Sequence, residues 1–232
     1  MATFFTITKE SRNPAKRKIL QNHYSLSPIQ GKGKQSLMWF YKDVNAIGSF
    51  FFMTPANAPV VYQTWGMLEQ RAQTIPDSFT YGPGFAYREY MEVSNRLVAI
   101  LISAGLYAFS ALVFSSRWIH SLASKYVVQP GSGPNEQTLQ NGNFTVTTIA
   151  RDVENKKFAR SIFKGSGDPG YLATSVMIAE AALAMIMDYD RLPDIAKEGG
   201  NLTPVTALGE VLKDRLEKTG RFNWNISVVN ES

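Results

Sequence analysis

The stretch GSGDPG at residues 165–170 decides how the second half of the chain folds. It stands between a strand-like run, residues 157–164, and a long apolar run, residues 171–187. A glycine-rich turn in this setting can cradle a pyrophosphate with successive backbone N–H groups at a helix N-terminus. In this turn, however, Asp168 would place a carboxylate against the phosphates, and Pro169 has no N–H to offer.

The same two residues are well suited to start a helix. Aspartate caps free N–H groups, and proline at the first helical position has its φ already set. We therefore interpret Asp168 and Pro169 as a helix cap and expect Asp168 to bond a backbone N–H near Tyr171. The alternative, a nucleotide cradle, needs free N–H groups there and a second parallel strand after the helix. Asp188 and Asp190 lie at the distance of a ribose ligand, but they fall at a helix end.

The composition is that of a folded protein, with 232 residues and 44% hydrophobic content. Without cysteine there are no disulfides, thiolate nucleophiles or cysteine-ligated metals, and an intracellular location is expected. The net charge of +5 is concentrated in residues 1–38, a basic segment that we expect to be solvated surface. Its charged residues are Lys9, Glu10, Arg12, Lys16, Arg17, Lys18, Lys32 and Lys34. It carries no nucleic-acid motif, so no nucleic-acid partner is expected.

An uncharged stretch of eighteen residues, LVAILISAGLYAFSALVF, occupies residues 97–114. It is flanked by Arg96, Arg117 and Trp118, which resemble interfacial anchors. This is the length at which a membrane helix becomes a candidate. Two interpretations stay open. The helix contacts a membrane, either spanning it or lying in one leaflet, or it is buried in the core or against another subunit.

The remaining patterns predict an α+β fold with a mixed or antiparallel sheet and packed helices. Alternation in residues 144–149 and 157–164 predicts a hairpin, and residues 222–228 a closing strand. Residues 50–53 and 79–93 also have the aromatic content of strands.

Two helices are predicted after the hairpin. The first, residues 171–187, has Glu180 as its only internal charge and is expected to be buried on most faces. The second starts at Leu202-Thr-Pro and ends at Gly220. Its apolar stripe consists of Leu208, Val211, Leu212 and Leu216.

Proline, glycine and asparagine are dense in residues 127–143, which indicates a linker. We expect a basic segment at residues 1–38, then an α+β domain at residues 39–232 that contains the apolar helix near residues 97–114.

The sequence contains no metal-ligand pattern, nucleophile elbow or phosphate loop. His23 and His120 have no second ligand at helical spacing. The candidate substrate-binding residues are Phe85, Tyr87 and Arg88, where a cation could hold an anionic group beside aromatic walls. The alternative is a strand whose residues face alternately inward and outward.

Glu180 is a further candidate for substrate binding. A carboxylate among alanines needs a hydrogen-bond partner or a raised pKa. Pairing with an arginine is one interpretation, and acid–base catalysis is the other.

Several blocks, most of which contain glycine or proline, occur in an order that resembles one family. They are FFMTP (51–55), YGPGFAYREY (81–90), VVQPGSGP (127–134), GDPGYLAT (167–174), AEAAL (179–183) and GGNLTPVTALG (199–209). Over roughly residues 39–232 the chain resembles the C-terminal part of the saccharopine dehydrogenase-like oxidoreductases, a family that includes trans-acting enoyl reductases of lipid and polyketide pathways.

The resemblance implies that an N-terminal Rossmann domain for NAD(P) is joined to a second α+β domain, and that this chain corresponds to the second. It implies no cofactor bound by this chain alone, and NAD(P) only with a nucleotide-binding partner protein. A homodimer and a hydrophobic acyl, lipid or polyketide substrate are further implications. Some members associate with membranes or lipid droplets, so a non-catalytic protein of that location is the alternative. No catalytic residue carries over from the family.

Overall fold

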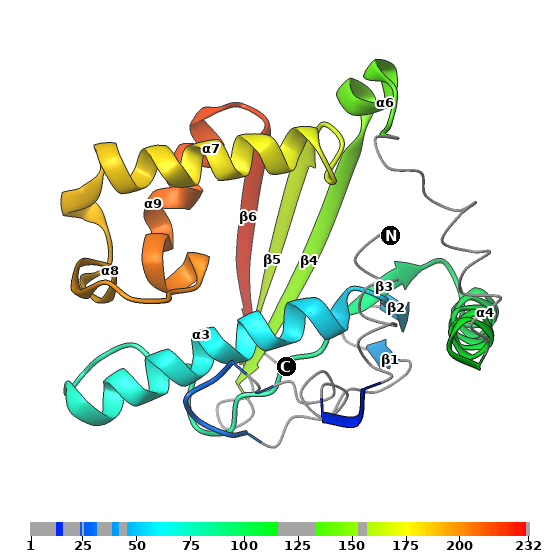
Figure 1. Ribbon diagram of the computed structural model, residues 1–232, viewed down its shortest axis with the longest axis horizontal. Helices are drawn as coiled ribbons and strands as arrows, with labels where there is room; N and C mark the ends of the chain where they lie inside the picture. Colours follow the sequence, from blue (N-terminus) through cyan, green and yellow to red (C-terminus); the bar gives the residue numbers. More distant parts are fainter. Residues whose placement is uncertain are drawn as a thin grey trace. The chain divides into compact units, whose positions relative to one another are not determined.

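The computed structural model divides the chain into two compact units, Met1–Ser132 and Gly133–Ser232 (Figure 1). It describes residues 13–15, 24, 26–31, 39–41, 46–115, 133–152 and 157–230. The division falls within the stretch of residues 127–143 that is predicted to be a linker. Most of the basic segment, together with His23 and His120, lies outside the described residues.

The first unit contains a three-stranded antiparallel sheet with β2 in the centre. Its elements are β1 (Trp39–Tyr41), β2 (Ala46–Phe50), α3 (Thr54–Thr74), β3 (Tyr90–Val93) and α4 (Arg96–Ser115). The prediction of strands at residues 50–53 and 79–93 is wrong for most of these positions. Only Phe50 and the last four residues of the second run pair in the sheet, because residues 79–89 pack as an irregular segment beside α3.

Helix α3 is not among the predicted elements, although its buried side chains have helical spacing. Ala58, Tyr62 and Trp65 lie on one side, at intervals of four and three residues. Pro55 supplies the fixed φ of a first-turn residue. These three side chains form the core of the unit with Tyr24.

Helix α4 is the apolar helix that the sequence predicts. It packs on β2 through Ala99 and Ser103, and the Ser103 hydroxyl accepts a hydrogen bond from the Phe50 N–H at 3.1 Å. Leu97 and Leu101 are 66% and 62% exposed. Among the helices in the described part of the chain, none has the length and hydropathy required to cross a membrane.

The second unit is an antiparallel sheet with helices on one face (Figure 1). Its elements are α6 (Glu136–Asn141), β4 (Asn143–Asp152), β5 (Lys157–Ser166), α7 (Leu172–Met187), η1 (Tyr189–Arg191), α8 (Asp194–Glu198), α9 (Pro204–Lys218) and β6 (Phe222–Asn230). The predicted hairpin is confirmed as β4 and β5, with β6 on the other side of β5. The α+β class with antiparallel sheets and packed helices is also confirmed.

Aromatic side chains of the sheet meet α7 and α9 in one core. Phe163 stacks on Trp224 with their ring centroids 4.0 Å apart, and Phe222 is buried with Ala173 and Leu216. Helix α9 begins and packs as predicted. Thr203 N donates to the Thr206 hydroxyl at 3.0 Å, and the apolar stripe faces the core.

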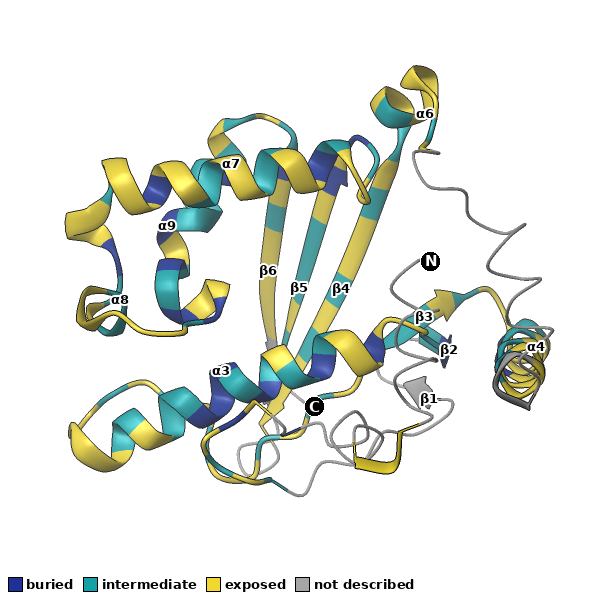
Figure 2. Ribbon diagram, in the orientation of Figure 1, coloured by how far each residue is buried: buried dark blue, intermediate teal, exposed yellow. Residues whose placement is uncertain are grey.

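The prediction that α7 is buried on most faces is wrong. Only Ala173 and Ala184 are buried, whereas Ile178 and Ile186 are 69% and 79% exposed (Figure 2). The sheet and α9 cover one side of the helix, and the apolar composition continues around to the side that faces away from them. Composition alone does not tell these two sides apart.

Two glycines allow α7 to follow β5 closely. A side chain at Gly165 would collide with the ring of Phe144 on the neighbouring strand. Gly167 has a φ of +98°, a conformation that strains residues with a side chain. Leu172 starts the helix directly beside it.

We predict that Gly167→Ala destabilises the protein by about 1–3 kcal/mol, through backbone strain at positive φ. The added methyl would also meet Leu172 Cδ2 at 3.0 Å. Urea unfolding measures the effect. The matched control is Gly170→Ala, in the same turn, where φ is not positive and the nearest heavy atom lies 3.4 Å away. Equal unfolding midpoints for the two variants would contradict the prediction.

Candidate functional site

The glycine turn uses its backbone N–H groups within the protein. Ser166 N donates to Arg221 O at 2.9 Å, Gly167 N to Gly142 O at 2.7 Å, and Asp168 N to Leu139 O at 2.8 Å. A pyrophosphate cradle needs such groups free. The turn is therefore a joint at which α6, β6 and α7 meet.

The predicted cap bond is present in this turn. Tyr171 N donates to Asp168 Oδ1 at 2.8 Å. The helix itself begins at Leu172, so Asp168 and Pro169 shape the turn that precedes it and do not occupy its first positions. After α7 the chain continues through η1, α8 and α9 to the antiparallel strand β6, and not to a parallel strand.

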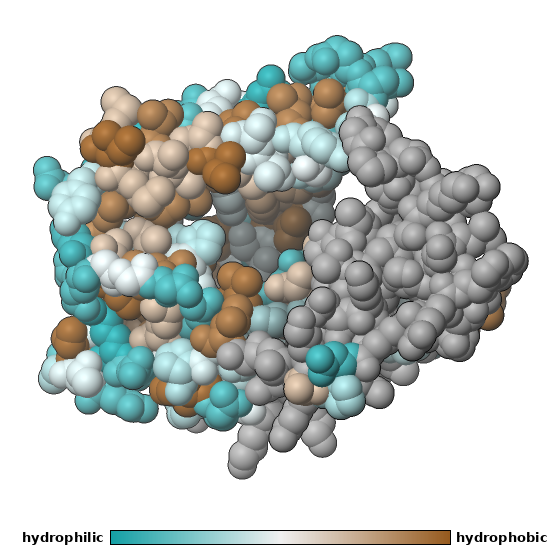
Figure 3. Space-filling model, viewed as in Figure 1, coloured by the Kyte–Doolittle hydropathy of each residue, from teal (hydrophilic) through white to brown (hydrophobic). Residues whose placement is uncertain are grey.

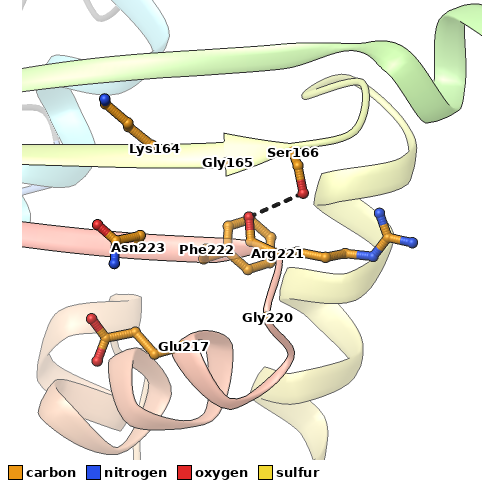
Figure 4. A pocket seen from close by; sticks show the side chains of 8 residues that line it. All are labelled: Lys164, Gly165, Ser166, Glu217, Gly220, Arg221, Phe222 and Asn223. Atoms are coloured by element: carbon orange, nitrogen blue, oxygen red, sulfur yellow. Dashed lines mark hydrogen bonds between the residues drawn. The ribbon is translucent and has the colours of Figure 1, made fainter.

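A hollow of about 440 Å³ borders the same joint (Figure 4). It is lined by Lys164, Gly165, Ser166, Glu217, Gly220, Arg221, Phe222 and Asn223. The side chains of Lys164 and Arg221 point in opposite directions, so they do not converge on one anion (Figure 4). Glu217 is bonded to Lys213 Nζ and to Trp224 N, each at 3.3 Å. The hollow is lined by charged residues, but its two cations do not converge and its carboxylate is bonded to Lys213 and Trp224.

Glu180 is held by an arginine, as one of the two interpretations requires. Arg215 of α9 donates through Nε to Glu180 and through a terminal nitrogen to Asp188, both at 2.7 Å. Arg191 adds bonds to Asp188 at 3.2 Å and to Asp214 at 2.7 Å. The hydrogen bond from Arg215 holds the pKa of Asp188 below its ordinary value. This network joins α7, η1 and α9 and engages the Glu180 carboxylate.

Phe85 and Tyr87 lie together in the first unit, against its aromatic core. Tyr62 Oη accepts from Tyr87 N at 3.0 Å and donates to Tyr87 O at 3.2 Å. Phe85 stacks on Trp65 and on Tyr81, with centroids 6.4 and 5.1 Å apart. Burial raises the pKa of Tyr62 to about 12. Both candidate residues thus help to pack the irregular segment onto α3.

A partly buried carboxyl follows these residues in the segment. Asn57 Nδ2 donates to Glu89 Oε1 at 2.8 Å. Burial raises the pKa of Glu89, and the hydrogen bond from Asn57 opposes this shift. Arg88, which stands between Tyr87 and Glu89, is exposed.

Sequence reasoning did not single out Asn57, Tyr62, Asp188 or Arg215 as parts of these clusters. The spacing of Ala58, Tyr62 and Trp65 is a signal that could have revealed the aromatic side of α3. No such signal exists for Arg215, whose partners lie 27 and 35 residues away in the chain. Among the described residues, no three histidine, aspartate or glutamate side chains gather as a metal site.

We predict that Arg215→Ala lowers the urea midpoint near neutral pH, because two carboxylates lose their shared donor. Because the pKa of Asp188 is lower in the folded protein than its ordinary value of 3.8, the ionised carboxylate stabilises the fold at pH values above 3.8. This stabilisation is lost as the pH falls below that value. The difference in urea midpoint between the wild type and Arg215→Ala should therefore become smaller below about pH 4.

The control is Lys213→Ala on the same helix, which pairs with Glu217 at 3.3 Å and Glu210 at 3.9 Å, carboxylates that are 34% and 86% exposed on their side chains. It should change the midpoint less than Arg215→Ala does. If the difference in urea midpoint between the wild type and Arg215→Ala stayed constant on acidification, ionised Asp188 would not be the group that Arg215 stabilises.

Comparison with known proteins relates the chain to one named group. It is 27% identical over 231 residues to a Mycobacterium tuberculosis (strain H37Rv) protein provisionally named a trans-acting enoyl reductase, covering 92% of this chain and 52% of that protein. Proteins named trans-acting enoyl reductase from Mycobacterium bovis and Mycobacterium ulcerans are also 27% identical, covering 73% and 65% of this chain and 39% and 36% of their own length.

No protein-family model matches the chain, and no solved structure matches it. The chain spans about half the length, or less, of the curated relatives that it matches. It is related over most of its own length to proteins named trans-acting enoyl reductases.

Proposed function

We propose that this chain is the substrate-side part of an enoyl reductase that acts on hydrophobic acyl or polyketide chains. The observation that carries the proposal is the extent of the similarity to proteins named trans-acting enoyl reductases. It covers 92% of the chain and so includes parts of both units. The saccharopine dehydrogenase-like architecture and an intracellular location belong to the same proposal.

The reductant in this proposal is NAD(P)H held by a nucleotide-binding partner protein. The fingerprint-like sequence of the chain does not fit the nucleotide, because Ser166, Gly167 and Asp168 N–H groups are bonded to backbone carbonyls. This supports a nucleotide site that lies outside the glycine turn. Enoyl reduction adds a hydride to the β-carbon and a proton to the α-carbon of the conjugated double bond. The task of this chain would be to bind the acyl group and orient that bond.

Among the candidate substrate residues, Arg88 is the one suited to an anionic group of the acyl carrier. It is exposed and follows the packed Tyr87, whose backbone is held at both N–H and carbonyl by Tyr62. A cation on a fixed backbone is a good anchor for a phosphate. Phe85 and Tyr87 would hold the segment that carries Arg88 in place. Glu180 would hold α7 in place, since its carboxylate is bonded to Arg215.

The proposal predicts NADPH consumption by the complex of this chain with its nucleotide-binding partner. The tagged protein would be isolated with its bound partner and mixed with NADPH and trans-2-hexadecenoyl-coenzyme A, and the loss of NADPH absorbance would be followed. The long thioester should have a lower KM than crotonyl-coenzyme A, because each buried methylene contributes about 0.8 kcal/mol. The chain alone should not oxidise NADPH.

Arg88→Ala should raise KM for the coenzyme A thioester roughly tenfold and leave kcat unchanged, as expected for a group that only binds. The matched control is Arg96→Ala, another exposed arginine of the same unit. Absence of NADPH consumption with every co-purified partner and both thioesters would overturn the reductase proposal.

One observation favours a second function, contact with a lipid surface. Helix α4 exposes Leu97, Leu101 and Leu112 at 66%, 62% and 54%. A helix of this kind can lie in the plane of a membrane interface. We predict that the protein floats with anionic phospholipid vesicles and that Leu101→Lys abolishes flotation, whereas Ile75→Lys, at an exposed position of the same unit, does not. Equal flotation of the two variants would exclude α4 as the contact.

A further inference from the structure

The outward side of α7 carries no charge. Thr174, Ser175, Ile178, Ala179, Ala182, Leu183, Met185, Ile186 and Met187 are exposed along the helix, and none is ionisable. The single charged residue, Glu180, is turned inward to Arg215. Figure 3 shows apolar side chains gathered over α7. A solvent-facing helix normally carries polar residues on this side, so the surface has the composition of an interface.

The exposed residues follow the spacing of a helix–helix seam. Six exposed positions are separated alternately by four and three residues, as in the a and d positions of a heptad. They are Ser175, Ile178, Ala182 and Met185 of α7, with Tyr171 in the turn before the helix and Tyr189 in η1 after it. The four large ones are 51–69% exposed: Tyr189 51%, Met185 52%, Tyr171 56% and Ile178 69%.

This seam is complementary to itself when one copy is reversed. The intervals four, three, four, three, four read the same in both directions. In an antiparallel pair, Ile178 of one copy would face Ala182 of the other, and Met185 would face Ser175. Within α7 each large side chain meets a small one, which lets the two helices approach closely. At each end of the seam Tyr171 of one copy would face Tyr189 of the other. A parallel pair would place Ile178 against Ile178 and Ala182 against Ala182.

The exposed area is adequate for a pair of this kind. At roughly 200 Å² for each fully exposed large side chain, the four large seam residues and Ile186 present on the order of 600 Å². The smaller stable interfaces bury about 600 Å² from each partner. The side chains of Glu180 and Asp188 hold α7 on α9 through Arg215, so the seam is ordered before binding.

We propose that this surface binds a second copy of the chain, with the two α7 helices antiparallel about a two-fold axis between Ile178 and Ala182. Isologous contacts of this type close on themselves and give a dimer. The inference does not depend on the reductase activity.

Sedimentation velocity of the 232-residue protein tests the dimer. The wild type should sediment as a dimer at micromolar concentration, and Ile178→Lys as a monomer with an unchanged circular dichroism spectrum, since the side chain is 69% exposed. The matched control, Val228→Lys, lies on β6 of the same unit at 70% exposure and should remain dimeric.

The absence of cysteine from the chain permits a test of the orientation. The double variant Ser175→Cys, Met185→Cys should form a disulfide-linked dimer on mild oxidation, and Ser175→Cys alone should not. The two positions lie about 15 Å apart along one helix, too far for a bond within one copy. Linkage of the Ser175→Cys single variant, as well as of the double variant, would show a parallel pair.

A monomeric wild type, or an Ile178→Lys variant that stays dimeric through another surface, would overturn the proposal. Maleimide labelling of Ser175→Cys measures whether the seam is accessible in a monomer. A monomer in which this cysteine is protected would have its seam covered by the first unit of the same chain, and that result also overturns the proposal. None of these outcomes depends on NADPH consumption, so the dimer and the reductase can fail separately.

Discussion

The paired hydrogen bonds from Arg215 to Glu180 and Asp188 are the interaction on which the second unit depends. They attach α9 to the middle and to the end of α7, while the apolar core between these helices is built mainly from small residues and leucines. A buried or partly buried carboxylate is tolerated only with such a partner. By turning the one charge of α7 inward, the network also leaves the opposite side of the helix uncharged.

The elements of the second unit could be predicted from the sequence because their signals are local. Alternation along β4, β5 and β6 and the Thr203-Pro204 start of α9 each depend on a few neighbouring residues. Helix α3 was missed because proline and β-branched residues in its first turns obscure a helical period that only Ala58, Tyr62 and Trp65 preserve. The exposed side of α7 was missed because an apolar helix does not show in sequence which side its neighbours cover.

The candidate site was harder to predict than the fold, because its contacts join distant positions. The aromatic segment around Tyr87 reads as a pocket wall in sequence, yet Tyr62 binds its backbone 25 residues away and makes it part of the packing. Glu180 was a reasonable candidate for acid–base chemistry until Arg215 was seen beside it. The relation to trans-acting enoyl reductases supplies a chemical class that neither cluster reveals alone.

The contact between α6 and the glycine turn has a consequence for amide hydrogen exchange. The N–H groups of Gly167 and Asp168 are protected by carbonyls of Gly142 and Leu139, which belong to the very first segment of the second unit. Local opening of that segment would expose these amides without unfolding the sheet. Their exchange rates therefore report whether α6 is docked, and the folding unit includes α6 and does not begin at its first strand.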